Sequence, residues 1–503
     1  MATEYSPLAA DVYSHASLEG SANQHAQDTA DWRGSTSSAS GVAGTAPDHD
    51  SKPSKKIYIV VGIFFTVLIA AGVMMCIMLI DTLTDPEARY AHLKNFCSHV
   101  GPISKAELST RRARLAEEMA HADVDVFVAE AGSTLFYLTG AAWEQSERPF
   151  LVVLSRLDNS SADPRQHEYL VVSPAFEHDK AVEEVGPGVS LVYYQEDQSP
   201  YAVLTKHLGL DAGTGAHVVV DRDARGFVHF GLAGALAPGH TASSDNGGAL
   251  VRQVRGIKST AEVAIMRCAN LATKAAIRAV LESVKGSTTQ ADVSARIATA
   301  LEIAGLSNTW SIALFGPNAA APHGIAGNAG LRLTKGMMIL LDAGGQLHGY
   351  QSDITRTVVW PLGATTSADG PEHFARTTLV WETVRDAHIA ALAAIRPGAL
   401  ASDVDAAARR VVQAAGFGGD YEAFTHRLGH GIGIDGHEDP YMNRGNAEEI
   451  QVGHCFSVEP GIYLKDEMGV RIEDIVCVTN STAPYYELFG ATSYLLQDPL
   501  KDH

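Results

Sequence analysis

Five residues in the last third of the chain belong to types that bind metal ions: Asp342, Asp353, His430, Glu459 and Glu473. The four carboxylates lie in or beside apolar runs such as MMILLD and VRIEDIVCV. A carboxylate in such a strand is costly unless it is paired or bound to a cation. Four carboxylates and one imidazole offer too many oxygen donors for a closed structural zinc site. They suit two hard or borderline divalent ions that share bridging carboxylates.

The spacing of the carboxylates predicts two β-hairpins. Asp342 and Asp353 flank a predicted turn, GGQLHG, and Glu459 and Glu473 flank a second turn, KDEMG. Residues symmetric about a hairpin turn face each other with Cβ atoms about 5 Å apart, and like charges at such positions destabilise the ladder. The pattern therefore predicts a positive ion between each pair. Two solvated acidic hairpin faces are the alternative, and the apolar flanking residues argue against it.

Length and charge restrict the class of protein. The chain has 503 residues and a formal net charge of −20. This length exceeds a single typical core, so two or more domains are expected. The acidic balance, with no basic stripe, argues against a nucleic-acid partner. No CxxC spacing supports a cysteine zinc site, and Cys455 and Cys477 are expected to be buried thiols in apolar strands.

Residues 57–80 form an uncharged apolar run near the N-terminus. As a helix this run would be roughly 36 Å long, enough to span a bilayer core. Lys55 and Lys56 precede it and mark the cytoplasmic side. We therefore expect a disordered cytoplasmic tail over residues 1–56, a single membrane-spanning helix, and a catalytic domain that is extracellular or luminal. A cleaved signal peptide is the alternative, which the long preceding segment disfavours.

Two domains are expected after this run. Alternating helix and strand patterns predict an α/β domain over residues 95–250, in which DVDVFVAEAG and TLFYLTG are interpreted as strands around a turn. The segment RQVRGIK links it to an α+β domain over residues 256–490, which contains the two carboxylate hairpins. The predicted helices of the second domain lie at 259–283, 289–304, 371–395 and 402–415.

Four motifs in order resemble the pita-bread metallopeptidases, and within them the Xaa-Pro aminopeptidases and prolidases. They are LLDAGGQLHGYQSDITRT, THRLGHGIGIDGHEDP, FSVEPGIY and GVRIEDIV. The resemblance extends to the linker and to DVDVFVAEAGSTLFYLTG, so that it covers residues 95–485. It implies a creatinase-like N-terminal domain followed by a pita-bread catalytic domain.

The resemblance also implies roles for single residues. The five residues above match the metal ligands of the family, and none of them is substituted. Glu459 would in addition carry the proton between water and the leaving nitrogen.

Four more residues match positions in the family motifs. His437 would stabilise the oxyanion, and His323 in APHG would position the substrate. Arg471 would orient Glu473. His426 matches a motif position as well, and a direct role and a supporting role both stay open.

The function implied by the resemblance is hydrolysis of the N-terminal Xaa-Pro bond of small peptides by a metal-bridged hydroxide. Manganese is the favoured ion, with cobalt or zinc as substitutes. A methionine aminopeptidase and a catalytically silent binding protein on the same fold are the alternatives. The sequence leaves open the choice between dipeptides and longer peptides. It also leaves open the oligomeric state, for which a homodimer is one possibility.

Overall fold

The computed structural model describes residues 85–157, 169–186, 189–245, 248–325, 327–367, 369–490, 496 and 498–500. These residues belong to one compact unit, Met75–His503. The predicted tail, residues 1–56, and the predicted membrane-spanning helix, residues 57–80, lie outside the described residues.

The sequence predicts a single-pass membrane protein whose catalytic domain lies outside the cell or in a lumen. The structure contradicts this prediction. Within the described ranges, every helix is too short or too polar to cross a membrane. The longest two, α9 (Thr260–Ser283) and α11 (Pro371–Ala394), have 24 residues each. Both carry charged side chains, such as Arg267 and Glu382, that a bilayer core disfavours. These helices pack on strands of the protein instead.

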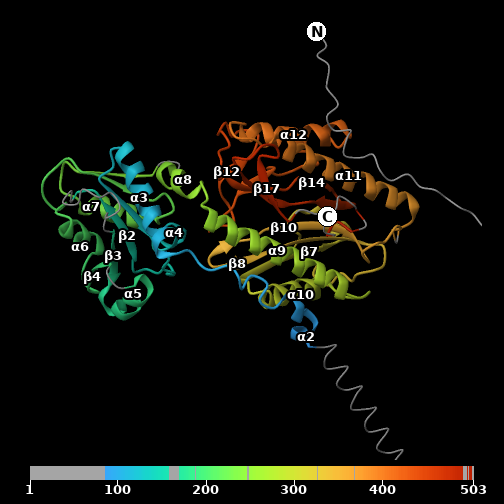
Figure 1. Cartoon of the computed structure of the whole chain (residues 1–503), viewed down its shortest axis with the longest axis horizontal. Coiled ribbons are helices and arrows are strands. Elements are labelled where there is room, and N and C mark those ends of the chain that lie inside the picture. Colours follow the sequence, from blue (N-terminus) through green and yellow to red (C-terminus); the bar gives the residue numbers. More distant parts are fainter. Residues whose placement is uncertain are drawn as a thin grey trace, which may run out of the picture. The chain divides into compact units, whose positions relative to one another are not determined.

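The N-terminal domain is built on a six-stranded mixed sheet with the order β4-β3-β2-β1-β5-β6. Its central strand β1 is buried at every position, as expected for a strand covered on both faces. Figure 1 shows helices on either side of this sheet. The strands are β1 (Val126–Glu130), β2 (Leu151–Ser155), β3 (Tyr169–Pro174), β4 (Ser190–Tyr194), β5 (His217–Val220) and β6 (Thr241–Ser244). The helices are α3 (Lys105–His121), α4 (Ser133–Thr139), α5 (His178–Val185), α6 (Pro200–His207) and α7 (Gly226–Ala235).

One element of this domain differs from the sequence prediction. The segment TLFYLTG, interpreted as a strand, lies in helix α4. A short apolar run does not distinguish a strand from a buried helix. The deciding signal is Gly140, which adopts a left-handed conformation (φ 77°) and donates its N–H to the carbonyl of Phe136, closing the helix.

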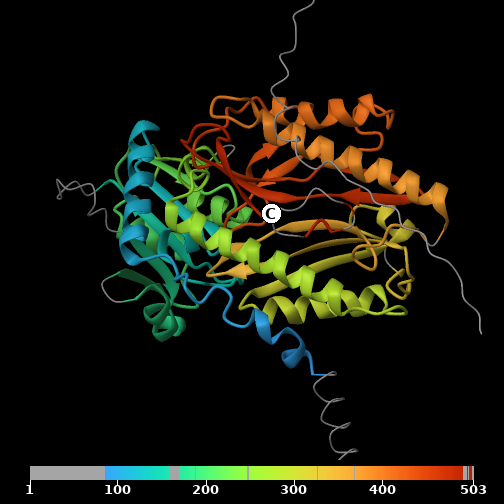
Figure 2. The ribbon, with the colours of Figure 1, turned by 45° about the vertical axis from the view of Figure 1, so that its right-hand side comes forward.

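Helix α8 (Ala249–Arg255) leads into the catalytic domain. Helices α9 and α10 (Gln290–Ile303) contact strands β7 (Ser307–Phe315) and β8 (Met338–Leu347), while α11 packs along α12 (Ala401–Ala414). In Figures 1 and 2 the two helix pairs lie on opposite sides of the strands of this domain. The predicted helices are therefore found, with ends shifted by at most one residue.

The strands between these helices form three sheets. One has the order β10-β8-β7, with β9 paired to β8; the second has the order β12-β11-β13-β16-β17; the third is the pair β14-β15. The remaining strands are β9 (Tyr350–Gln351), β10 (Ile354–Val359), β11 (Gly429–Gly431), β12 (Glu438–Met442), β13 (Cys455–Val458), β14 (Gly461–Leu464), β15 (Met468–Arg471), β16 (Asp474–Val478) and β17 (Tyr486–Phe489).

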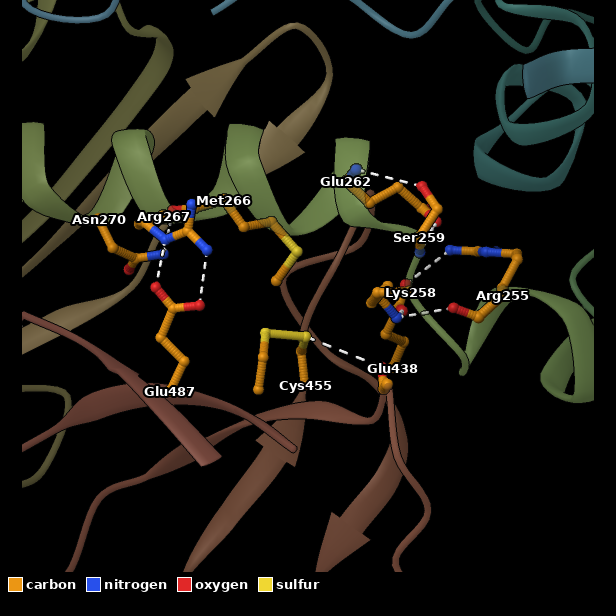
Figure 3. Close-up of a disulfide and its surroundings, with 12 residues drawn as sticks. Arg255, Lys258, Ser259, Glu262, Met266, Arg267, Asn270, Glu438, Cys455 and Glu487 are labelled. Atoms are coloured by element: carbon orange, nitrogen blue, oxygen red, sulfur yellow. Dashed lines mark hydrogen bonds and ion pairs between the residues drawn. A yellow bond between two sulfur atoms is a disulfide. The ribbon is translucent and has the colours of Figure 1, made fainter. Parts of the chain in front are cut away.

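The prediction of free buried thiols at Cys455 and Cys477 is wrong. The two residues are directly opposed in the β13–β16 ladder and form a disulfide, which Figure 3 shows beneath helix α9. A second disulfide joins Cys97 to Cys268 of α9. Cross-strand partners bring their Cβ atoms close enough to bond, which the sequence shows only once the register is known.

Candidate metal centre

The first carboxylate pair lies on a hairpin formed by β8, β9 and β10. Its turn is centred on His348 and Gly349, which have φ values of 49° and 85° as a tight two-residue turn requires. Asp342 is therefore opposite Thr355, and Asp353 lies just before β10. The predicted hairpin is present, but the predicted facing of Asp342 and Asp353 is wrong because the turn is one residue further along the chain than expected.

The second pair faces each other as predicted. Val458 pairs with Asp474 on one side and Gly461 pairs with Arg471 on the other. Glu459 and Glu473 occupy the facing positions between these two ladders. Glu459 directly follows the fully buried strand β13, and Glu473 directly precedes the fully buried strand β16. Both side chains therefore project from rigid backbone.

The structure brings all five predicted ligands into one cluster. Candidate ligand atoms of Asp342, Asp353 and Glu473 lie within 4.8 Å of one another, and so do those of His430, Glu459 and Glu473. The Nε2 atom of His430 is 3.3 Å from Oε1 of Glu459 and 3.9 Å from Oδ2 of Asp353. Its Nδ1 atom is 3.1 Å from the carbonyl of Gly431, and a hydrogen bond there leaves Nε2 free to bind an ion.

The protein itself leaves these carboxylates poorly compensated. Three buried oxygens, Oδ1 of Asp342, Oδ1 of Asp353 and Oε1 of Glu473, have no hydrogen-bond partner. Burial and the neighbouring carboxylates raise the pKa of Asp353 and of Glu473 well above its usual value, and burial raises the pKa of Glu459 to about 7. A divalent cation would reverse this repulsion and occupy the free oxygens. The donor set, rich in carboxylate oxygen, fits such an ion.

Arg471 supports the cluster from behind. Its Nη2 donates to Oδ2 of Asp342 at 2.6 Å, and its Nε donates to Oγ1 of Thr355 at 3.0 Å. Thr355 in turn donates to Oε2 of Glu473 at 2.7 Å. Arg471 therefore contacts Asp342 directly and reaches Glu473 through a threonine. The sequence analysis missed Thr355, although a hydroxyl two residues after Asp353 projects from the same face of the strand.

His426 belongs to the same supporting network. Its Nδ1 is 2.7 Å from the carbonyl of Arg427, and its Nε2 is 2.9 Å from the hydroxyl of Tyr463. That hydroxyl accepts from Nη1 of Arg471 at 2.8 Å, so it is free to donate to His426. Burial lowers the pKa of His426 to about 3, which keeps the ring neutral as this bonding pattern requires. This arrangement favours the supporting alternative for His426.

The cluster opens into a cavity of about 1010 Å³. His323 and His437 both line it, as do Arg427 and the apolar side chains of Trp310 and Ile312. The ring centroid of His437 lies 4.0 Å from that of His430. Arg427 and Trp310 are not apparent as site residues from the sequence, because neither is a metal-ligand type and both lie in segments predicted to have other roles.

Comparisons with known proteins agree with this geometry. Residues 264–480 match the model of metallopeptidase family M24, and residues 111–255 match the creatinase/prolidase N-terminal domain. An uncharacterised peptidase of Schizosaccharomyces pombe is 36% identical over 390 residues, which are 75% of this chain and 81% of that protein. The chain belongs to metallopeptidase family M24. The resemblance seen in the four sequence motifs is thereby confirmed, and the protein is a metallopeptidase of a family that uses divalent metal ions.

Two further similar proteins carry the name dipeptidase. A Xaa-Pro dipeptidase of Lactobacillus delbrueckii subsp. lactis is 29% identical over 359 residues, or 71% of this chain and 90% of that protein. The crystal structure of dipeptidase PepE from Mycobacterium ulcerans has a TM-score of 0.66 and 32% identity, and covers 77% of this chain and 97% of its own. This metallopeptidase therefore shares its two-domain core with named dipeptidases.

The hydroxyl of Thr355 gives a prediction about metal affinity. Replacing it by Thr355→Val removes the bond to Glu473 and the bond from Arg471, and should weaken divalent-ion binding about 10- to 100-fold, the usual cost of losing a partner of a metal ligand. Titration calorimetry of the metal-free protein measures this. Thr357→Val is the matched control, since Thr357 lies on the same face of β10 but its hydroxyl bonds only the backbone of Arg471. Equal affinities in both variants and the wild type would contradict the assignment.

Proposed function

We propose that this M24 metallopeptidase is a Xaa-Pro dipeptidase that works with two divalent ions, manganese by preference. The single observation that carries the proposal is the buried cluster of four carboxylates and His430, with three unpartnered oxygens, at the floor of a peptide-sized cavity. The names of the related dipeptidases support the substrate class.

The five clustered residues would hold the ions. When bound, the ions supply a nucleophile from water at neutral pH and polarise the scissile carbonyl. Glu459 would move the proton. Its Oε1 accepts from Oγ of Ser457 at 3.2 Å, and that serine hydroxyl also accepts from the backbone N–H of His430. With one oxygen fixed in this way, the other can take a proton from water and deliver it to the leaving nitrogen.

The histidines of the cavity would act on the substrate. His437 is exposed to the cavity beside His430, where an imidazole N–H can donate to the oxygen that becomes negative in the transition state. His323 lies on the cavity wall, in the loop that follows β7, and would hold the residue after the scissile bond. Two donors at fixed positions favour one peptide geometry.

The preference for proline has a physical counterpart in the cavity. Proline has no backbone N–H and a fixed φ near −65°, so its site needs no acceptor and favours a rigid apolar surface. Trp310, Ile312 and Pro322 supply apolar side chains to the cavity wall.

Arg427 favours a dipeptide over a longer peptide. Its guanidinium stacks 4.5 Å from the ring centre of Tyr441 and lines the cavity. Within the described part of the chain, no carboxylate forms an ion pair with it. A dipeptide places its C-terminal carboxylate only one residue from the scissile bond, where an arginine on the wall of the cavity can bind it. A longer peptide has an uncharged amide at that point.

One prediction of the proposed function concerns the residue after the scissile bond. The metal-loaded protein should cleave Xaa-Pro dipeptides with at least a tenfold higher kcat/KM than matched Xaa-Ala dipeptides, a difference of about 1.4 kcal/mol. Steady-state kinetics on the paired peptides measures it. Equal rates would refute proline specificity. Cleavage limited to Met-initiated peptides would favour a methionine aminopeptidase, and no cleavage of any peptide by the metal-loaded protein would favour the silent binding protein.

Another prediction of the proposed function concerns the role of Arg427 in substrate binding. Arg427→Ala should raise KM for a Xaa-Pro dipeptide about 10-fold or more, the scale of a charge-assisted hydrogen bond, and should change the kinetics of the corresponding dipeptide amide much less. Arg444→Ala is the control, because Arg444 pairs with Asp420 at an exposed position outside the cavity. A similar rise in KM for the dipeptide and for its amide would show that Arg427 does not bind the substrate carboxylate.

A further inference from the structure

We infer that the creatinase-like domain positions His437 for catalysis. It does so by holding both sides of the loop that carries this histidine, through Ser133 and Arg222. This inference rests on the function proposed above, because it gives His437 its importance. Ser133 and Arg222 are positioning residues in this account, since neither lines the cavity that contains the carboxylate cluster.

His437 depends on its loop for its position. It is the last residue of the connection between β11 and β12, and its side chain is exposed to the cavity. Among the described residues, none forms a hydrogen bond with its ring. Apart from its ring contact with His430, the imidazole is positioned by its backbone, so the placement of the loop largely determines where it lies.

Acidic residues on each side of His437 anchor this loop. At the inner side, Nη2 of Arg255 lies 2.7 Å from Oδ2 of Asp435 and 2.8 Å from Oε2 of Glu438. Nζ of Lys258 lies 2.6 Å from the other oxygen of Glu438, a contact drawn in Figure 3. Arg255, Lys258 and Glu438 are all buried, so these contacts also contribute to the fold.

The outer contacts come from the N-terminal domain. Ser133, the first residue of α4, donates its hydroxyl to Oδ1 of Asp435, two residues before His437. Arg222, which follows β5, places Nη1 3.1 Å from Oδ2 of Asp439, two residues after His437. The N-terminal domain therefore contacts the chain on both sides of His437. We call the two contacts, Ser133–Asp435 and Arg222–Asp439, the outer latch.

The outer latch acts across a space that is not filled by side chains. Ser133, Arg222, Asp435, Asp439 and His437 all line a second cavity of about 440 Å³. Polar contacts, rather than close apolar packing, therefore fix this side of the loop. Loss of the outer latch leaves room for the loop to move, and a displacement of about 1 Å at a catalytic group can cost about 100-fold in rate.

The test combines Ser133→Ala with Arg222→Ala in the full chain loaded with manganese. The double variant should lower kcat for a Xaa-Pro dipeptide about tenfold or more, with a smaller change in KM and an unchanged number of bound ions. Arg148→Ala is the control, because it removes an exposed ion pair with Glu196 in the same domain, away from the loop. An unchanged kcat in the double variant would overturn the inference.

A double-mutant cycle shows whether the latch acts through His437. In a His437→Ala background the same two substitutions should have almost no further effect on kcat, because the group they position is gone. An equal fold-loss in both backgrounds would mean that the latch affects the enzyme by another route, and the inference would be wrong.

Hydrogen exchange separates this inference from the proposed function. In the double variant the amides of residues 432–437 should exchange about tenfold faster or more than in the wild type, while those of β8 and β10 stay unchanged. If the wild type fails to cleave Xaa-Pro dipeptides, the proposed function is wrong and exchange still reports on the latch. Unchanged exchange in the loop would overturn the latch whatever the activity.

Discussion

The mutual repulsion of four clustered carboxylates, three of them buried, is the constraint on which the catalytic domain depends. Asp342, Asp353 and Glu473 are each less than one-tenth exposed. Among the described residues, Arg471 is the one Arg or Lys that forms an ion pair with the cluster. One guanidinium cannot balance four carboxylates in a medium of low dielectric constant. The fold holds these groups together in spite of this cost. Such an arrangement is understandable if divalent ions complete the site.

The architecture makes this arrangement rigid. Two hairpins supply the carboxylates from strands that are buried along their length, and the Cys455–Cys477 disulfide joins the two strands that lead to Glu459 and Glu473. Arg471 links the two hairpins because it bonds Asp342 and Thr355 of the first from its own place on the second. Ligands fixed in this way need little reorganisation when an ion binds.

Residue spacing in the sequence predicts part of the site correctly. The features that depend on how the strands pair with one another could not be predicted. The facing of Glu459 and Glu473 was predicted correctly because the turn, at residues 465–467, lies midway between them. The facing of Asp342 and Asp353 was not, because left-handed backbone at His348 and Gly349 shifts the turn. Ser133 contacts Asp435 from a distant segment, which no local pattern reveals, whereas the only local sign of Thr355 is its position two residues after Asp353 on the same strand face. The predicted membrane anchor, inferred from the apolar run at residues 57–80 and the lysines before it, falls outside the described residues, and no described helix could cross a membrane.

We propose that the carboxylate cluster binds two divalent ions. Titration calorimetry of the metal-free protein with manganese, checked by elemental analysis, tests it most directly when the wild type is compared with Glu473→Gln. This substitution keeps the size of the side chain and removes one charge. We predict about two ions per wild-type chain and at least one fewer in the variant. Absence of metal from the wild type at every ion concentration, or full occupancy in the variant, would contradict the account.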